Sequence, residues 1–137
     1  MSYAFITGAS SGIGEACARR LAQEKWNLVL VARRLDRLTR LAGELSKQHG
    51  VDVRVFPLDV TDRQGLSRLA HDESALFGKV TLLVNNAGLA IGRETLQDSR
   101  PEDWDVMFDT NVKGLLNVTH FLLPHLLRNR GHVVNIG

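Results

Sequence analysis

The stretch Thr7-Gly8-Ala9-Ser10-Ser11-Gly12-Ile13-Gly14 decides the fold of this 137-residue chain. It follows a short apolar run at residues 3–6 and precedes apolar residues at helical spacing, a pattern that predicts a strand, a glycine turn and a helix start. In such a turn one glycine adopts a conformation closed to other residues, another lets the main chain approach a ligand, and a third allows a helix to pack closely on a strand. Unpaired N–H groups and the positive end of the helix dipole favour an anion, so the turn predicts a pyrophosphate site.

The spacing of these glycines is G-x-x-x-G-x-G, which differs from the G-x-G-x-x-G pattern usual for dinucleotide binding. Taken alone, the stretch therefore leaves open an ordinary glycine-rich turn without a ligand. The remainder of the chain has to decide between these two interpretations.

The composition is that of a single globular domain spanning residues 1–137, with 44% apolar and 23% charged residues. The net charge of +2 comes without a basic stripe, which argues against a nucleic-acid partner. The single cysteine, Cys17, excludes an intrachain disulfide, and we expect it to be a buried small side chain. Because the chain has neither a secretory signal pattern nor an apolar run of membrane-spanning length, we predict a cytoplasmic protein without a membrane partner. The five histidines lack the spacing of metal ligands, so we predict no metal site.

Apolar runs and helical patterns alternate along the whole chain. Strands are predicted at residues 3–6, 27–32, 53–58, 80–84 and 132–137. Helices are predicted at residues 13–25, 35–49 and 61–77, and from 99–101 to about 127. This alternation predicts an α/β fold, a Rossmann-type doubly wound parallel sheet with strand order 3-2-1-4-5. The order reverses between the first and fourth strands, where the ligand crevice of such sheets lies.

Prolines and capping residues refine this pattern. Pro57 predicts an edge position for the third strand, because proline cannot donate a hydrogen bond inside a sheet. Thr61 with Gln64, and Ser99 with Glu102, are spaced like the capping pairs that begin helices. The first helix is expected to bury a face made of Ile13, Ala16, Cys17 and Leu21.

Two cations, Arg33 and Arg34, follow the second predicted strand. The adenosine ribose of a dinucleotide would lie at this strand end, and arginine can fork onto the 2′-phosphate that NADP carries and NAD lacks. We therefore predict NADP as the cofactor. The alternative is a solvated pair at the start of a helix that also carries Arg37 and Arg40. Asp59, which follows the third strand, could accept a hydrogen bond from the adenine amino group or be a plain loop carboxylate.

The run Asn85-Asn86-Ala87-Gly88 ends the fourth predicted strand. Its carboxamides can bridge neighbouring strand ends, and its small residues leave the backbone open for a ribose. Turn-forming asparagines would explain the run about as well. Because this loop and the glycine turn converge on the same crevice, the two together favour a pyrophosphate site.

Asn111 falls in the middle of the longest predicted helix, among apolar neighbours. Helix propensity disfavours asparagine at such a position. It is therefore either a solvent-facing residue without a role or one kept for its side chain or for a local distortion of the helix. The last predicted helix also contains Pro124, which should kink or end it within a turn.

The whole chain resembles the short-chain dehydrogenase/reductase family. The resemblance rests on four motifs in this order and spacing: the glycine segment at residues 7–14, Asp59-Val60, Asn85-Asn86-Ala87-Gly88 and Asn111. The resemblance implies that the glycine segment holds the pyrophosphate, through Gly8, Gly12, Ile13 and Gly14. Ser10 and Ser11 would contact the phosphates or the adenosine side. Arg33 and Arg34 match the position where NADP-preferring members carry basic residues.

The same resemblance assigns the remaining motifs. Asp59 and Val60 would meet the adenine, and the ribose region would be met by Asn86, Ala87 and Gly88. Asn111 matches the family's active-site asparagine, which bends its helix and steadies a water in the proton relay. It is the one catalytic residue that this chain would supply.

Within the family, the runs at residues 85–92, 102–104, 109–115 and 129–137 resemble NADP-dependent dehydrogenases of 3-hydroxy acids and of serine-like amino acids. The resemblance implies an oxidoreductase that transfers a hydride between nicotinamide and a small hydroxy or carbonyl compound. It also implies a homo-oligomer, a dimer or tetramer, to which part of the long helix contributes an apolar interface.

Family members carry a serine just after the fifth strand and a Tyr-x-x-x-Lys further on, and this chain stops at or just before the expected serine. We therefore expect the cofactor-binding half of the enzyme, truncated after strand five and inactive alone, with an exposed apolar edge on that strand. A non-catalytic NADP-binding sensor or interaction module is the alternative, against which Asn111 argues.

Overall fold

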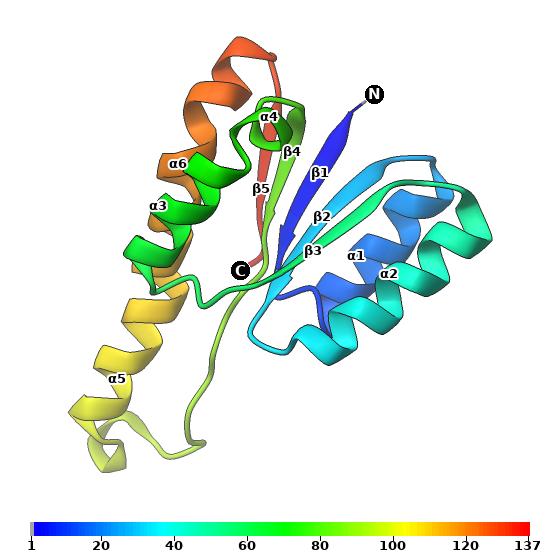
Figure 1. The fold of residues 1–137 in the computed structure, drawn as a ribbon. Coiled ribbons are helices and arrows are strands. Elements are labelled where there is room, and N and C mark those ends of the chain that lie inside the picture. Colours follow the sequence, from blue (N-terminus) through cyan, green and yellow to red (C-terminus); the bar gives the residue numbers. More distant parts are fainter. Residues whose placement is uncertain (1) are drawn as a thin grey trace.

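The computed structural model describes residues 2–137. Five parallel strands form one sheet in the order β3-β2-β1-β4-β5, which confirms the predicted fold and strand order (Figure 1). The strands are β1 (Tyr3–Thr7), β2 (Asn27–Ala32), β3 (Val53–Pro57), β4 (Val80–Asn85) and β5 (His132–Asn135). β3 lies at one edge of the sheet, as Pro57 predicts, and β5 lies at the other.

Helices cover both faces of this sheet (Figure 1). One face packs against α1 (Gly12–Gln23) and α2 (Leu35–His49), and the other against α3 (Arg63–Asp72), α4 (Ser74–Phe77) and α6 (Leu115–Arg128). The central strand β1 and its neighbour β2 are buried at every position, because each of their faces meets a helical layer. This explains why their sequences are continuous apolar runs instead of alternating ones.

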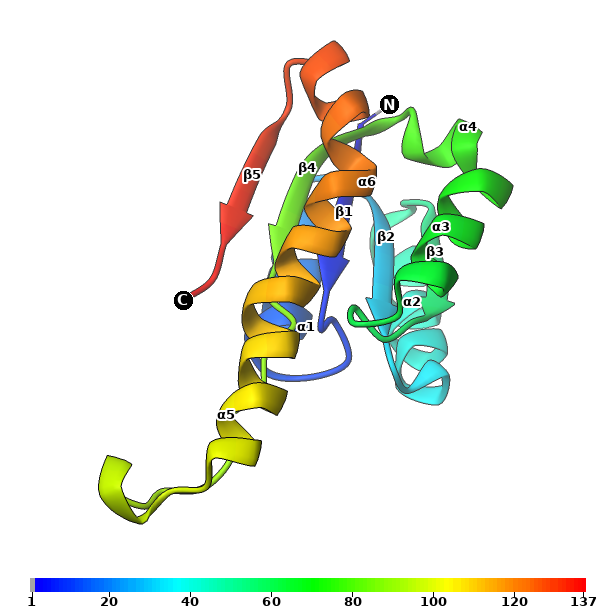
Figure 2. The same cartoon turned by 90° about the vertical axis from the view of Figure 1, so that its left-hand side faces the viewer.

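The longest predicted helix is three consecutive segments. α5 (Pro101–Phe108) continues through the π-helical segment η2 (Asp109–Gly114) into α6. α5 extends past the carboxyl end of the sheet together with the loop that precedes it, which contains the short 3-10 helix η1 (Leu96–Asp98) (Figure 2). Pro124 lies inside α6, which ends one turn later at Arg128.

The buried face of α1 differs from the prediction. The residues that are fully buried are Gly14, Ala18 and Ala22, whereas Ile13 is 58% exposed and Ala16 is exposed as well. Cys17 is half-buried at the edge of this face. The helix is rotated toward its smallest side chains because the glycine turn brings its first turn directly against the end of β1, where larger residues do not fit.

For both predicted capping pairs, the structure has a different residue at the capping position. α3 begins after Asp62, whose carboxylate accepts a hydrogen bond from Gly65 N at 3.0 Å, so Thr61 is not the cap. The helix predicted over residues 61–77 is also interrupted, between Asp72 and Ser74. At α5 the capping position is Arg100, without a side-chain bond. Ser99 instead accepts a hydrogen bond from Trp104 Nε1.

Within the described residues the edge strand β5 pairs with β4 alone, and it exposes about two-fifths of Val133 and Val134, as expected. Several apolar side chains of α5, η2 and α6 are exposed too, among them Trp104, Phe108, Val112, Leu116 and Leu123. Across residues 2–137 no helix combines the length and the apolar character needed to cross a membrane.

Candidate functional site

A cleft of about 710 Å³ opens at the carboxyl ends of the central strands. It lies where the strand order reverses, between β1 and β4, as open α/β sheets place their ligands. The predicted residues that line it are Gly8, Ser10, Ser11, Arg33, Arg34, Asp59, Val60, Asn86, Ala87 and Gly88. The structure therefore gathers residues from four separate loops around one space.

The glycine turn forms the floor of this cleft. Gly8 and Gly12 have φ angles of +60° and +58°, a backbone region that residues with side chains rarely adopt. Gly14 serves packing instead, because a Cβ at this position would overlap the carbonyl oxygen of Gly8 and the side chain of Asn86. These are the roles expected of glycines in such a turn.

The buried hydroxyl of Thr7 ties the β4 loop to the end of β1. Thr7 Oγ1 accepts hydrogen bonds from Asn86 N at 3.0 Å and from Ala87 N at 2.9 Å. In return, Asn86 Nδ2 donates to Gly8 O at 3.1 Å. The two loops that the sequence places at one crevice are thus joined directly, which fixes the width of the cleft at this point.

Asn85 makes the corresponding bridge on the other side of β4. Its Nδ2 donates to Asn135 Oδ1 of β5 and to Thr119 Oγ1 of α6, each at 3.0 Å. Asn85 is 4% exposed and does not line the cleft. The predicted bridging of neighbouring strand ends by the paired asparagines is confirmed, with Asn86 reaching β1 and Asn85 reaching β5.

Three arginines, Arg33, Arg34 and Arg37, line the end of the cleft beyond β2. Within residues 2–137, none of their guanidinium groups forms an ion pair, so their charges are free to meet an anion. From the sequence alone, Arg37 is expected only as one of the solvated cations of the following helix. Its spacing of one helical turn from Arg33 and Arg34 is the signal that could have assigned it to the site.

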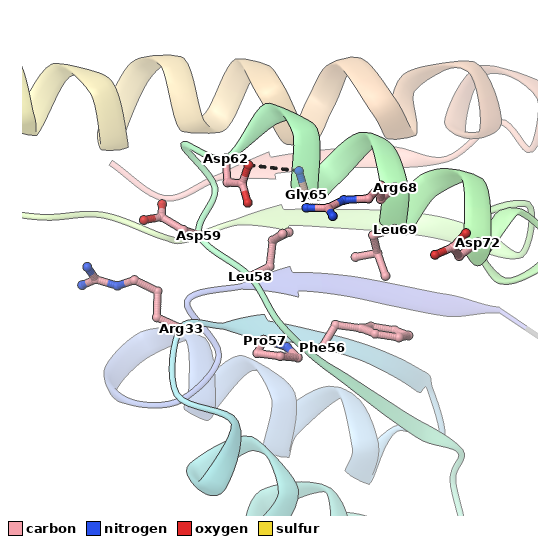
Figure 3. Close-up of a pocket in the computed structure, with 10 residues that line it drawn as sticks. All are labelled: Arg33, Phe56, Pro57, Leu58, Asp59, Asp62, Gly65, Arg68, Leu69 and Asp72. Carbon is pink, nitrogen blue, oxygen red and sulfur yellow. Dashed lines mark hydrogen bonds between the residues drawn. The ribbon is translucent and has the colours of Figure 1, made fainter.

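Asp59 stands opposite these cations. Burial raises its pKa, but hydrogen bonds from the backbone N–H and hydroxyl of Thr61 and the charge of Arg33 outweigh burial, and the pKa of Asp59 lies below its ordinary value. Figure 3 shows Arg33 and Asp59 at one end of a second hollow, of about 610 Å³, that runs along β3 toward Asp72. This hollow continues the cleft, since the two share Arg33, Leu58 and Asp59.

Asn111 lies in the π-helical segment η2, so the helix is distorted where the sequence allows for a distortion. Its side chain is not free in solvent. Oδ1 accepts a hydrogen bond from Leu89 N at 2.7 Å, and Nδ2 donates to Leu89 O at 2.8 Å. Asn111 therefore stands behind Leu89, which lines the cleft, and does not line it directly.

Three further predicted residues also lie outside the cleft lining. Gly14 packs beneath it, Ile13 points away from the core, and Gly12 lines a neighbouring hollow between α1 and α2. Conversely, Thr110 lines the cleft, although nothing in its residue type distinguishes it from other polar helix residues.

A family model described as short chain dehydrogenase matches residues 2–137. Curated relatives include sulfoacetaldehyde reductase 2 of Chromohalobacter salexigens (46% identity; 96% of this chain and 52% of that protein). They also include serine 3-dehydrogenase of Agrobacterium fabrum (42% identity; 96% and 51%) and an NADP-dependent 3-hydroxy acid dehydrogenase of Salmonella typhi (41% identity; 96% and 52%). The chain spans about half the length of these relatives.

Among solved structures, an alcohol dehydrogenase from the archaeon Thermococcus sibiricus, complexed with 5-hydroxy-NADP, has the same fold. It superposes with a TM-score of 0.91 at 36% identity, over 98% of this chain and 57% of that one. The serine and 3-hydroxy acid dehydrogenases that the narrower resemblance predicts are thus among the relatives. From its glycine turn to β5, the chain belongs to the short-chain dehydrogenase family.

Proposed function

We propose that this chain binds NADP, as the cofactor-binding part of an oxidoreductase that moves a hydride between nicotinamide and a small hydroxy or carbonyl compound. The observation that carries the proposal is the cleft itself. Its floor is a glycine turn with open backbone, and its wall is a loop tied to that turn through Thr7 and Asn86. Its far end holds Arg33, Arg34 and Arg37, which form no ion pair within residues 2–137.

The residues present fit the parts of the cofactor. The backbone of Gly8, Ser10 and Ser11 would hold the pyrophosphate, with Gly12, Ile13 and Gly14 shaping the turn. Arg33 and Arg34 would hold the 2′-phosphate. Asp59 and Val60 would face the adenine, while the nicotinamide ribose region falls to Asn86, Ala87 and Gly88.

When bound, NADP supplies the hydride acceptor or donor, and the protein supplies binding and orientation. Asn111 would fix the loop that carries Leu89 and so the wall nearest the reacting end of the cofactor. We assign Asn111 to the active site on this ground and on its match to the family motif.

The substrate of the whole protein is proposed to be a 3-hydroxy acid or a related small hydroxy compound, because the relatives are named for serine, 3-hydroxy acids and sulfoacetaldehyde. A cytoplasmic location and a dimeric or tetrameric assembly belong to the same proposal. The exposed apolar residues of α5 and α6 are available for such an assembly.

The decisive experiment is calorimetric titration of the purified protein with NADP and with NAD. We expect NADP to bind at least about tenfold more tightly than NAD, the ratio that one charge-assisted contact to the 2′-phosphate supplies. Failure to bind either nucleotide would refute the proposal, and equal affinity would refute the assignment of NADP.

A further inference from the structure

Val60, which lines the cleft, is held from behind by the helix that carries Asn111. Its side chain is 6% exposed and packs against the junction of η2 and α6. A Cβ at Gly114 would lie 2.5 Å from Val60 Cγ2, so the absence of a side chain at this junction is what lets Val60 sit as deep as it does. The position of this part of the cleft wall is therefore set by α6 as much as by the β3 loop.

One buried carboxamide fixes the backbone of the same residue. Asn117 of α6 is 8% exposed, and its Nδ2 donates to Val60 O at 2.9 Å. Its Oδ1 accepts from Arg63 Nε at 2.9 Å. A guanidinium can only donate and a carbonyl oxygen can only accept, so a single orientation of the amide satisfies both partners. Arg63 thus keeps the donor side of Asn117 facing Val60.

We propose that Asn117 is a positioning residue for the adenine side of the cleft. It acts through Val60: by holding the Val60 carbonyl, it keeps the side chain of Val60 at the depth that an adenine ring requires, and Arg63 keeps Asn117 in the right orientation. The inference deepens the proposed function and rests on it, because it takes Val60 to face the adenine.

The variant that isolates this role is Asn117→Asp. An aspartate has the same shape and strengthens the contact with Arg63, but it replaces the N–H donor facing Val60 O by an oxygen. The hydrogen bond that holds this wall of the cleft is lost, while the packing of α6 is kept. We expect the affinity for adenosine 2′,5′-bisphosphate, measured by calorimetry, to fall about tenfold, the ratio that corresponds to one buried hydrogen bond.

The chain offers a matched control in Asn129, which follows α6 at its opposite end. Its Nδ2 also donates to backbone carbonyls, those of Gly78 and Val80, at 2.9 and 3.0 Å, far from the cleft lining. Asn129→Asp should lower the thermal midpoint much as Asn117→Asp does, yet leave the affinity for adenosine 2′,5′-bisphosphate within about twofold. A purely structural Asn117 would make the two variants indistinguishable in affinity, and that result would overturn the proposal.

A second variant decides the matter should Asn117→Asp fail to fold. Arg63 is exposed at the first position of α3, and Arg63→Met changes no residue that lines the cleft while freeing the amide of Asn117 to turn over. We expect a loss of about threefold in affinity for the same ligand; unchanged affinity would count against the proposal. If the unmodified protein does not bind adenosine 2′,5′-bisphosphate at all, both the proposed function and this inference are refuted.

Discussion

Asn111 and Leu89 exchange two hydrogen bonds, the side-chain amide of one meeting both backbone groups of the other at 2.7 and 2.8 Å. The pair closes a ring between the π-helical segment and the loop that follows β4. Since Asn86 and Ala87 of the same loop are also tied to β1 through Thr7, the first residues after β4 are held from two sides. Asparagine is disfavoured inside helices, and here the side chain of Asn111 holds a wall of the cleft in place.

Replacing Asn111 by Leu should release this loop. We expect the free energy of unfolding, measured by urea denaturation, to fall by about 1 to 2 kcal/mol, because two hydrogen bonds are lost at a partly solvated site. Lys113→Ala is the control in the same segment: it removes only an exposed ion pair to Asp109 and should change the stability by less than about 0.5 kcal/mol. Equal effects of the two variants would mean that the Leu89 contact contributes nothing.

Arg33 and Arg34 should determine the preference for NADP over NAD. In the double variant with serine at both positions, we expect the affinity for NADP to fall about tenfold to a hundredfold, because charge-assisted contacts to the 2′-phosphate are lost. The affinity for NAD should change little. Arg20→Ser, on the exposed face of α1 and paired with Glu24, should leave both affinities unchanged. Parallel losses for NADP and NAD would contradict a 2′-phosphate site.

Replacing glycine by alanine should have opposite effects on stability at Gly14 and at Gly43. Alanine at Gly14 would overlap the carbonyl of Gly8, backbone that cannot move cheaply, and should destabilise the protein by at least about 2 kcal/mol. Alanine at Gly43, inside α2, meets nothing within 4 Å and should stabilise it by about 0.5 to 1 kcal/mol through helix propensity. Thermal denaturation of the two variants tests both signs; a tolerated Gly14→Ala would show that the turn can open.

The tie between Tyr3 and Asp52 should make stability depend on pH at both extremes. Burial opposes the charge of Asp52, but hydrogen bonds from Tyr3 and Arg54 prevail and lower its pKa, so its contribution is complete above about pH 5 and is lost as the pH falls through the lowered value. The hydrogen bond to Asp52 and then burial raise the pKa of Tyr3, whose contribution is complete below about pH 10 and is lost as the pH rises through the raised value.

Tyr3→Phe tests both limbs at once. We expect the free energy of unfolding of this variant to vary less with pH than that of the unmodified protein, below pH 5 as well as above pH 10. Because Tyr3 is the only tyrosine, its titration can also be followed directly by its absorbance. An ordinary titration midpoint would show that the contact with Asp52 does not persist in solution.

Much of the fold follows from patterns that depend on single elements. Continuous apolar runs identify β1 and β2, and Pro57 identifies the edge strand, because these signals reflect how many faces and neighbours a strand has. The glycine spacing predicts the turn, since positive φ angles and close packing act locally. The loops that line the cleft could be identified from the sequence because their signals are local in the same way.

What the sequence could not supply depends on contacts between distant elements. Ile13 belongs to the apolar spacing of α1, yet it is exposed because the packing of Gly14 on Gly8 sets the rotation of that helix. Asn117 belongs to no recognisable sequence motif, and its role depends on Val60, which lies 57 residues away in the chain. Caps depend on which side chain reaches a free N–H in the first turn, as Asp62 reaches that of Gly65 in place of Thr61.

The π-helical segment η2 makes the number of residues between α5 and α6 part of the site. Each residue added to or removed from a helix turns one end against the other by roughly 100°. Deleting the exposed Lys113 would change no residue of the cleft lining, yet it would let a regular helix form and swing Asn111 away from Leu89 while Asn117 stays at Val60. In this stretch, insertions and deletions should therefore be tolerated far less than substitutions at the same positions.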